Sequence, residues 1–328
     1  LNFQPDLVWI RARSAGGYHV MVDSVRGAGK ILSSNSTNAE NSYGGDSATA
    51  FSAFLSNGFT VGYQTTWWTN GTSSGSEPHV AWCWKAGGSP SSNSDGTITS
   101  SVSANATAGF SIVGYTGNGS DNATIGHGLG VAPDMVMIKN RDTGGGNNWY
   151  VFHSSLDSGD YVKLNSTSTA AAVSGTSNGG IGSVDSDTVN FTQGSSDNKN
   201  VNESGDNFIA YCFSNVDGYL KAGSYKGNGN TNGTFVYTGF KPAFVMIKRT
   251  NEAASWVLHD SKRAGYNADN DFIHPDLSQA ESDGSGGTID LLSNGFKCRD
   301  TTGWRNESSD TYIYLAFAQR PFKYANAR

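Results

Sequence analysis

The sequence predicts an all-β protein built from three tandem, degenerate β-sandwich repeats of a lectin-like or jelly-roll-like kind. Composition is the first reason: the 328 residues include 42 Gly and only 7 Pro, with 12% aromatic and 15% charged residues, which is typical of short aromatic strands joined by polar turns. The second is that no stretch of about a dozen residues keeps a helical apolar spacing without interruption by Gly or by Ser, Thr and Asn. The third is a block of sequence that recurs three times.

Each copy of the block begins with a Pro-led apolar run and a basic residue. The runs are PDLVWI, PDMVMI and PAFVMI, followed by Arg11, Lys139 and Lys248. A second six-residue pattern follows at residues 19–24, 149–154 and 256–261. It begins with an aromatic residue or His, continues with apolar or aromatic residues, and ends with Asp or His and then Ser. Each copy closes on an alternating segment, HVAWCW, FIAYCF or YIYLAF. A period of roughly a hundred residues corresponds to a whole domain rather than to a solenoid turn.

The repeats divide the chain into four predicted segments. Repeat one spans residues 1–88, a Gly/Ser/Asn-rich connector with little capacity to form a core spans 89–108, and repeats two and three span 109–218 and 219–328. Repeats two and three open with a strand and a glycine turn, at 110–120 and 223–240, which repeat one lacks. We therefore expect either that the chain is the mature or ordered portion of a longer polypeptide, or that a neighbouring subunit donates the missing strand.

Local patterns within a repeat predict individual elements. Residues 79–84 alternate with apolar side chains available to both faces, which predicts that the closing strand is central in its sheet. The SNGF segments at 56–59 and 293–296 predict tight hairpins. Three residues are predicted to be small buried thiols without disulfides: Cys83, Cys212 and Cys298.

Charge and hydropathy exclude two classes of partner. The net charge is −6, and the 22 basic residues are scattered, so we expect no nucleic-acid partner, because phosphate binding needs clustered Lys and Arg. No apolar run approaches the ~20 residues that span a bilayer, so we expect no membrane insertion.

Catalytic patterns are weak. His153 and His259 stand near Asp160 and Asp260, but no Ser lies in a G-x-S-x-G elbow, and the repeat places Asp23, His153 and Asp260 at one equivalent position. We therefore predict that the protein is not an enzyme. Paired carboxylates for glycoside cleavage depend on spatial spacing, which leaves a polysaccharide depolymerase open as a minor alternative.

No cofactor or metal is expected. The acidic segments at 157–160 and 268–271 could offer oxygen ligands to Ca²⁺, but neither has the twelve-residue loop pattern. Asp and Asn are also common turn residues, and solvated turns are the preferred interpretation.

Aromatic residues in polar loops are the best candidates for a binding site. Trp67 and Trp68 lie in GYQTTWWTNGTSSG, and Trp304 lies in RDTTGWRNESS. Exposed aromatic rings beside amide and hydroxyl groups are suited to stacking on sugars, so the candidate binding residues are Trp67, Trp68, Asn70, Trp304, Arg305 and Asn306. The alternative is that these loops fold over a neighbouring domain or subunit and bury the rings. The other five tryptophans lie in apolar strands and are predicted core: Trp9, Trp82, Trp84, Trp149 and Trp256.

Several of these segments resemble a known family. FQPDLVWI, DSVRG, SNGFTVG and VAWCWKAGG, together with GFKPAFVMIKRT and the C-terminal YIYLAFAQRPFKYANAR, are similar to a repeat common in structural proteins of marine tailed bacteriophages, usually described as tail-fibre or virion-associated proteins. The resemblance covers nearly the whole chain. It implies a location in the virion and supplies no catalytic residues. Members of the family ordinarily run further upstream of the PDLVWI segment.

The resemblance and the residues together predict a function. We expect a non-enzymatic bacteriophage virion protein, a tail-fibre or surface-appendage subunit that acts in host attachment and binds glycans through its aromatic loops. The expected partners are other copies of the chain, in a homo-oligomer such as a trimer, other virion proteins and a host-surface glycan. The alternative is a purely structural fibre, filament or capsid-decoration subunit without receptor binding.

Overall fold

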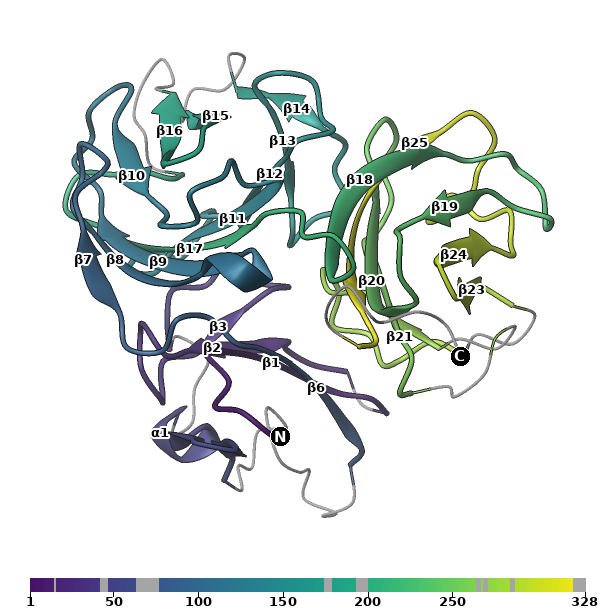
Figure 1. Cartoon of the computed structure of the whole chain (residues 1–328), viewed down its shortest axis with the longest axis horizontal. Coiled ribbons are helices and arrows are strands. Elements are labelled where there is room, and N and C mark those ends of the chain that lie inside the picture. Colours follow the sequence, from purple (N-terminus) through teal and green to yellow (C-terminus); the bar gives the residue numbers. More distant parts are fainter. Residues whose placement is uncertain are drawn as a thin grey trace.

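The computed structural model describes residues 1–14, 16–41, 47–62, 77–173, 179–192, 200–263, 267, 271–283 and 287–320. Within these ranges the chain is nearly all β, as the composition predicts. The described helical elements are α1 (Ser47–Ala50) and the 3₁₀ turn η1 (Ala106–Ala108). The strands group into three lobes, each with one large sheet and one smaller sheet or hairpin (Figure 1).

The first lobe has a four-stranded sheet and a hairpin. The sheet has the order β3-β2-β1-β6, and β4 pairs with β5. The strand bounds are β1 (Leu7–Ala12), β2 (Val20–Asp23), β3 (Leu32–Ser33), β4 (Ala53–Leu55), β5 (Gly58–Thr60) and β6 (His79–Trp84). The SNGF turn joins β4 to β5 through a two-residue loop, with Leu55 opposite Gly58, as predicted.

The second lobe has an eight-stranded and a three-stranded sheet. Their orders are β14-β13-β12-β11-β17-β9-β8-β7 and β10-β16-β15. The strands of the large sheet are β7 (Ser91–Asn93), β8 (Ser100–Asn105), β9 (Phe110–Thr116), β11 (Met135–Asn140), β12 (Tyr150–His153), β13 (Asp160–Lys163), β14 (Ala171–Ala172) and β17 (Asn207–Phe213). Those of the small sheet are β10 (Thr124–Gly126), β15 (Gly180–Val184) and β16 (Thr188–Thr192).

The third lobe has a five-stranded and a three-stranded sheet. Their orders are β18-β25-β20-β21-β22 and β19-β24-β23. The strand bounds are β18 (Leu220–Lys226), β19 (Phe235–Tyr237), β20 (Pro242–Arg249), β21 (Val257–Asp260), β22 (Phe272–Ile273), β23 (Ile289–Leu292), β24 (Gly295–Cys298) and β25 (Thr311–Ala318). The second SNGF turn joins β23 to β24, with Leu292 opposite Gly295, as predicted.

The Pro-led run and the closing strand pair in the same way in all three large sheets. Each Pro-led strand lies between the strand that follows it and the closing strand: β1 between β2 and β6, β11 between β12 and β17, and β20 between β21 and β25. The central residues also match in register, with Val8 opposite Cys83, Val136 opposite Cys212 and Val245 opposite Ala316. This register defines the corresponding positions in the three lobes.

The closing strand is central in two lobes but not in the first. Strand β17 lies between β11 and β9, and β25 lies between β20 and β18, as the alternation predicts. In the part of the first lobe that the structure describes, strand β6 lies at the edge of its sheet, so the prediction of a central position is wrong there. The physical reason is that the first lobe has no described strand corresponding to β9 or β18.

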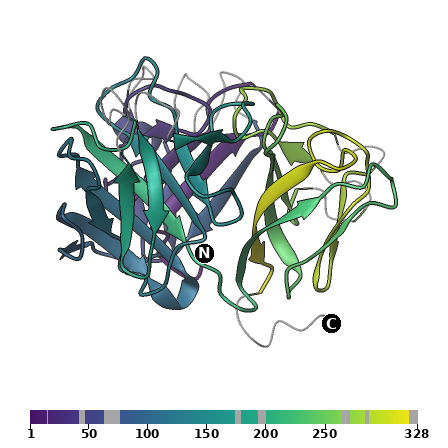
Figure 2. The same cartoon turned by 90° about the horizontal axis from the view of Figure 1, so that it is seen from above.

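Both faces of each large sheet are buried. One face packs on the smaller sheet of its own lobe, through Phe191 in the second lobe and Phe296 in the third. The other face, including Trp9, Tyr211 and Phe317, joins a single hydrophobic cluster shared by all three lobes. Figures 1 and 2 show the lobes side by side with their large sheets toward the centre. All five tryptophans predicted as core are buried.

The predicted connector is not structureless. Within residues 89–108, β7 and β8 form and extend the large sheet of the second lobe, with Val102 opposite Val113. Small residues alternate there with a few apolar ones, which is sufficient for an edge of a sheet whose core is supplied by its neighbours. The predicted repeat boundaries themselves stay a prediction.

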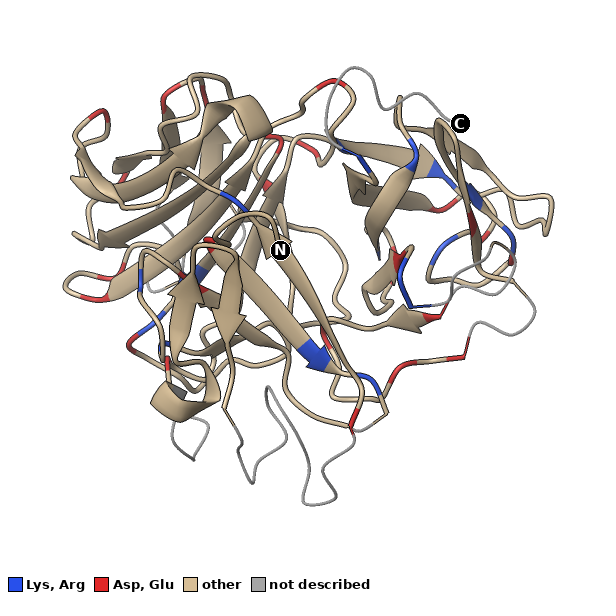
Figure 3. Cartoon of the chain, turned by 60° about the horizontal axis from the view of Figure 1, so that its bottom comes forward, with Lys and Arg blue, Asp and Glu red and all other residues tan. Residues whose placement is uncertain are grey.

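Charged residues are dispersed over the strands and loops of all three lobes (Figure 3). Cys212 and Cys298 are buried and Cys83 is half-buried, and all three thiols are free.

Candidate functional site

Several buried polar groups lie along the seams between the lobes. Three backbone hydrogen bonds, at corresponding positions, define these seams. The amide of Glu40 donates to the carbonyl of Arg141 at 2.7 Å, that of Ala170 donates to Thr250 at 2.8 Å, and that of Glu281 donates to Arg13 at 2.7 Å. The first lobe thus bonds to the second, the second to the third, and the third to the first.

The basic residue that follows each Pro-led run crosses the same seams. Lys139 donates to the carbonyl oxygen of Thr37 at 3.3 Å, Lys248 to that of Thr167 at 3.0 Å, and Arg11 to that of Ser278 at 3.0 Å. All three cations are fully buried. Burial lowers the pKa of Lys139 to about 7, that of Lys248 to about 8 and that of Arg11 to about 10, because it disfavours the charged form.

Ring nitrogens at the start of the second strand of the block repeat this pattern. The indole N–H of Trp149 donates to the carbonyl of Ser33 at 2.8 Å, and that of Trp256 donates to Lys163 at 2.9 Å. At the corresponding position in the first lobe, the ring of His19 is fully buried. In two of the three seams, a buried indole N–H therefore donates to a carbonyl group of the neighbouring lobe.

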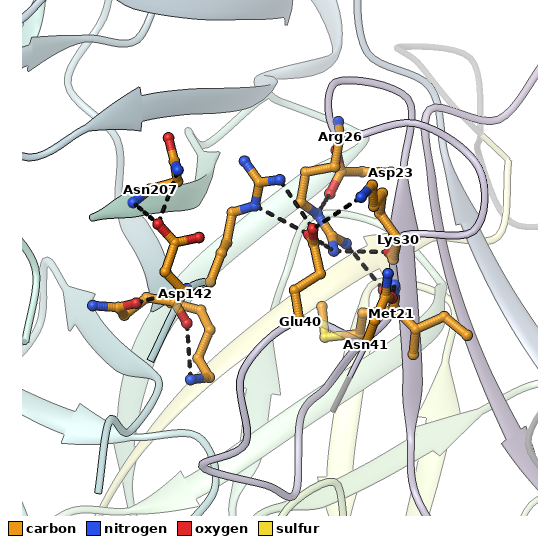
Figure 4. Close-up of polar contacts among 12 residues, drawn as sticks. Met21, Asp23, Arg26, Lys30, Glu40, Asn41, Asp142 and Asn207 are labelled. Carbon is orange, nitrogen blue, oxygen red and sulfur yellow. Dashed lines mark hydrogen bonds and ion pairs between the residues drawn. The ribbon is translucent and has the colours of Figure 1, made fainter. Parts of the chain in front are cut away.

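A buried acid–base network lies at the seam between the first and second lobes (Figure 4). Arg26 forms an ion pair with Asp23 and donates to Glu40 Oε2 at 3.0 Å. Tyr211, from the second lobe, donates its hydroxyl to Asp23 at 2.8 Å, and Arg141 donates to Glu40 at 3.0 Å. Burial raises the pKa of Glu40, but the guanidinium groups of Arg141 and Arg26 outweigh burial and hold it below its ordinary value.

Two of the residues considered for catalysis, His153 and Asp260, occupy corresponding places in the other seams. Asp260 pairs with Arg263 and accepts the indole N–H of Trp82 at 3.2 Å. His153 bonds to the carbonyl of Tyr314 at 3.2 Å, and burial lowers its pKa to about 4. Each of these groups is thus engaged in a contact between lobes.

An open polar pocket of about 740 Å³ lies where the three lobes meet. Its lining includes Tyr18, Asn38, Asn35, Asn165, Asp276 and Ser278. Asn35 accepts a hydrogen bond from the His19 amide at 3.0 Å, and Asn165 accepts one from the Trp149 amide at 2.8 Å. These amide side chains fix the loop backbone next to His19 and Trp149. The pocket is therefore the space left between loops where the three lobes meet.

Of the candidate aromatic residues, the described part of the chain contains Trp304. Its side chain is 37% exposed, and its ring centroid lies 5.0 Å from that of His274 and 5.8 Å from that of Phe272. Trp67, Trp68 and Asn70 lie outside the described residues. The structure therefore presents one partly exposed ring from the candidate set.

The neighbours of Trp304 in the candidate set face inward. Arg305 is buried, pairs with Asp300, and stacks its guanidinium carbon 4.6 Å from the ring centre of Phe272. The side chain of Asn306 is fully buried and accepts a hydrogen bond from the Asn228 amide at 3.0 Å. In this structure both side chains contact protein groups rather than solvent.

Sequence reasoning missed that Asn306 clamps a glycine turn. The turn Gly227–Asn228–Gly229 is also held by the amide of Gly229, which donates to the carbonyl of Asn306 at 2.9 Å. In the second lobe Asn202 accepts from the Asn118 amide at 2.9 Å in the same way. Both asparagines precede the first residue of the closing segment by the same interval, so an alignment of the repeats contains the signal.

Other predicted sites show no cluster that would bind a metal ion. Across the described ranges, no group of three or more His, Cys, Asp and Glu side chains is placed to hold such an ion. Burial and the charge of Asp157 raise the pKa of Asp160 in the first acidic segment, and the second segment lies largely outside the described residues. Among the helices that the structure describes, none is long and apolar enough to cross a bilayer.

The sheets and seams define the class: an all-β protein of several sheets that share one central core. Residues 1–321 match the family described as Domain of unknown function (DUF7483), and the chain belongs to that family. Comparison with the curated proteins gave no match, and neither did comparison with the solved structures.

Proposed function

We propose that the chain consists of three degenerate β-sandwich repeats, at residues 1–88, 109–218 and 219–328, arranged around a pseudo-threefold axis. The support is the shared strand register together with the contacts at corresponding positions, which run in cyclic order from lobe to lobe. The burial of one cation in each seam supports the same arrangement.

On this scaffold we propose a non-enzymatic function as a bacteriophage virion subunit, in a tail fibre or surface appendage that takes part in host attachment. The observation that carries the proposal is the use of His153, Asp260 and the three buried cations in contacts between lobes, which builds a rigid body and leaves the polar loops to face outward. Such a body is suited to an extracellular particle. The resemblance to repeats of phage structural proteins supports a location in the virion.

Mass spectrometry of purified phage particles tests whether the protein is part of the virion. We expect peptides of this chain at a copy number comparable with that of other structural proteins. Absence of the chain from particles that contain the remaining structural proteins would reject the virion assignment.

We propose that the aromatic loops, including Trp304, contact a host-surface glycan. In the purified protein, Trp304→Ala is expected to lower the binding of host cells or arrayed glycans by at least tenfold. The matched control is Tyr237→Ala, which removes another exposed ring, 66% exposed, on β19. Thermal unfolding of both variants checks that they are folded, because the Trp304 ring also packs on His274 and Phe272.

The alternative is a purely structural subunit, and the inward orientation of Arg305 and Asn306 favours it over a receptor-binding loop. Phage particles that contain folded Trp304→Ala protein and adsorb to host cells as the parent particles do would support this alternative. A polysaccharide depolymerase stays a minor alternative, and release of reducing sugar from host capsule by the purified protein would support it.

A further inference from the structure

Among the described residues, the first lobe has an open edge where the other lobes have a strand. Closing strand β17 pairs with β9 over seven residue pairs, and β25 pairs with β18 over seven. Among the residues that the structure describes, β6 pairs with β1 alone. The inference below rests on the proposed equivalence of the three repeats and is independent of any role in the virion.

The backbone of β6 is oriented to accept a neighbour. In an antiparallel ladder, alternate residues bond to one side, and the bond from the Arg13 amide to the Pro78 carbonyl at 2.8 Å directs the even-numbered residues of β6 toward β1. The amide and carbonyl groups of His79, Ala81 and Cys83 therefore face the open side. An unpaired row of this kind is a template for strand addition.

A second open edge lies on the smaller layer of the same lobe. Strand β16 pairs with β10, and β24 pairs with β19. Within the described ranges, the corresponding strand β5 pairs with β4 alone. In each complete lobe, one continuous segment supplies both neighbours, β9 with β10 or β18 with β19, so one segment would close both edges of the first lobe.

Apolar side chains near these edges are incompletely buried. Phe59 and Val61 are partly exposed, and they correspond to Phe296 and Cys298 in the third lobe, which are both 0% exposed. Cys83 is also partly exposed, while the corresponding Cys212 is 0% exposed. The first lobe therefore leaves open the apolar surface that the opening segment covers in the other lobes.

The two opening segments share a recognisable chemistry. Both contain Tyr-x-Gly-Asn-Gly, at residues 115–119 and 225–229. The first glycine is required by close packing, because a Cβ at Gly117 would lie 2.2 Å from the carbonyl oxygen of Glu203, and one at Gly227 would lie 2.1 Å from that of Glu307. A segment that replaced the missing one in the first lobe would therefore consist of a strand, a Gly-Asn-Gly turn and a second strand.

We propose that the open edges of β5 and β6 form a docking surface for a strand–turn–strand segment of a partner polypeptide with the Tyr-x-Gly-Asn-Gly pattern. A second copy of this chain is not the proposed occupant, because its own segments of this kind are already paired within their lobes. The docked segment adds its first strand to β6 and its second strand to β5.

The test uses the whole chain and a fluorescein-labelled synthetic peptide with the sequence of residues 219–238. We expect saturable binding by fluorescence anisotropy, and slower hydrogen exchange of the Ala81 and Cys83 amides in the complex. A scrambled peptide of the same composition is expected not to bind. Ala81→Pro removes an outward amide without removing a bond to β1, and it should weaken binding at least tenfold.

The matched control is Ala81→Val, which keeps the amide and should bind the peptide as the parent does. Thermal unfolding of both variants checks that Ala81→Pro is folded. Three results would overturn the proposal: no saturable binding to the folded parent, equal binding of the scrambled peptide, or equal binding by Ala81→Pro. A concentration-dependent dimer that Ala81→Pro dissociates and the peptide does not compete with would assign the edge to a second copy instead.

Discussion

At the scale of single residues, the buried cations explain why each Pro-led run is followed by Lys or Arg. The sequence pattern marks these positions, and the structure shows each side chain donating to a carbonyl group of the neighbouring lobe. A buried lysine without a carboxylate partner is costly to protonate, and its carbonyl partners offset part of that cost. The seams should therefore respond to pH.

We expect the free energy of unfolding to rise between about pH 7 and pH 8.5, in part through Lys139. Burial lowers the pKa of Lys139 from 10.5 to about 7 in the folded protein, so in this range the unfolded chain binds the proton and the folded chain does not. Stability then increases with pH. Lys139→Met should reduce this slope by about 1 kcal/mol per pH unit, as measured by urea unfolding.

The control for that measurement is Lys262→Met, which removes an exposed lysine and should leave the slope unchanged. The range stops near pH 8.5 because burial raises the pKa of Cys212 and Cys298 from 9.0 to about 12, which lowers stability at higher pH. A slope in Lys139→Met equal to that of the parent would contradict the prediction.

At the scale of elements, the loops before the closing strands are hydrogen-bonded to the glycine turns of the opening segments. The loop that precedes each complete closing strand carries an asparagine, Asn202 or Asn306, whose side chain holds the turn of the opening segment. Alternation predicts the closing strands themselves, because period two is a local property. It does not reveal the clamp, which joins residues far apart in the chain.

Asn306→Ala should destabilise the protein by about 2–4 kcal/mol, because it leaves the Asn228 amide and two carbonyl groups without their buried partner. Asn202→Ala should have a similar effect in the second lobe. Asn232→Ala, at an exposed position, should change stability by less than about 0.5 kcal/mol. Denaturant unfolding of the three variants checks the prediction, and an unaltered midpoint for Asn306→Ala would return this residue to the binding candidates.

At the scale of the whole molecule, the central hydrophobic cluster links the three lobes. Phe244 illustrates this: its ring centroid lies 5.9 Å from that of Trp82 and 5.7 Å from those of Trp84 and Phe317. Two of these partners belong to the first lobe and one belongs to the third. Because every large sheet buries one face in this cluster, we expect the chain to unfold as one cooperative unit.

Phe244→Ala should lower the free energy of unfolding by about 3–5 kcal/mol while keeping a single transition. Tryptophan fluorescence, which reports on all three lobes through residues such as Trp82, Trp149 and Trp256, and far-ultraviolet circular dichroism should give the same midpoint. The control is Phe235→Ala on β19, where the ring is 44% exposed and little change is expected. More than one transition in either signal would show that the lobes unfold independently.

The all-β class, the hairpins at the SNGF turns and the burial of five tryptophans were determined by the sequence, since alternation, turn chemistry and apolar character are local properties. Only the tertiary structure decided that β6 is an edge strand, that residues 89–108 join a sheet, and that Arg305 and Asn306 face inward. These outcomes depend on which distant segment lies alongside each residue. A pattern of period two specifies two faces of a strand, but it does not specify the strand's neighbours.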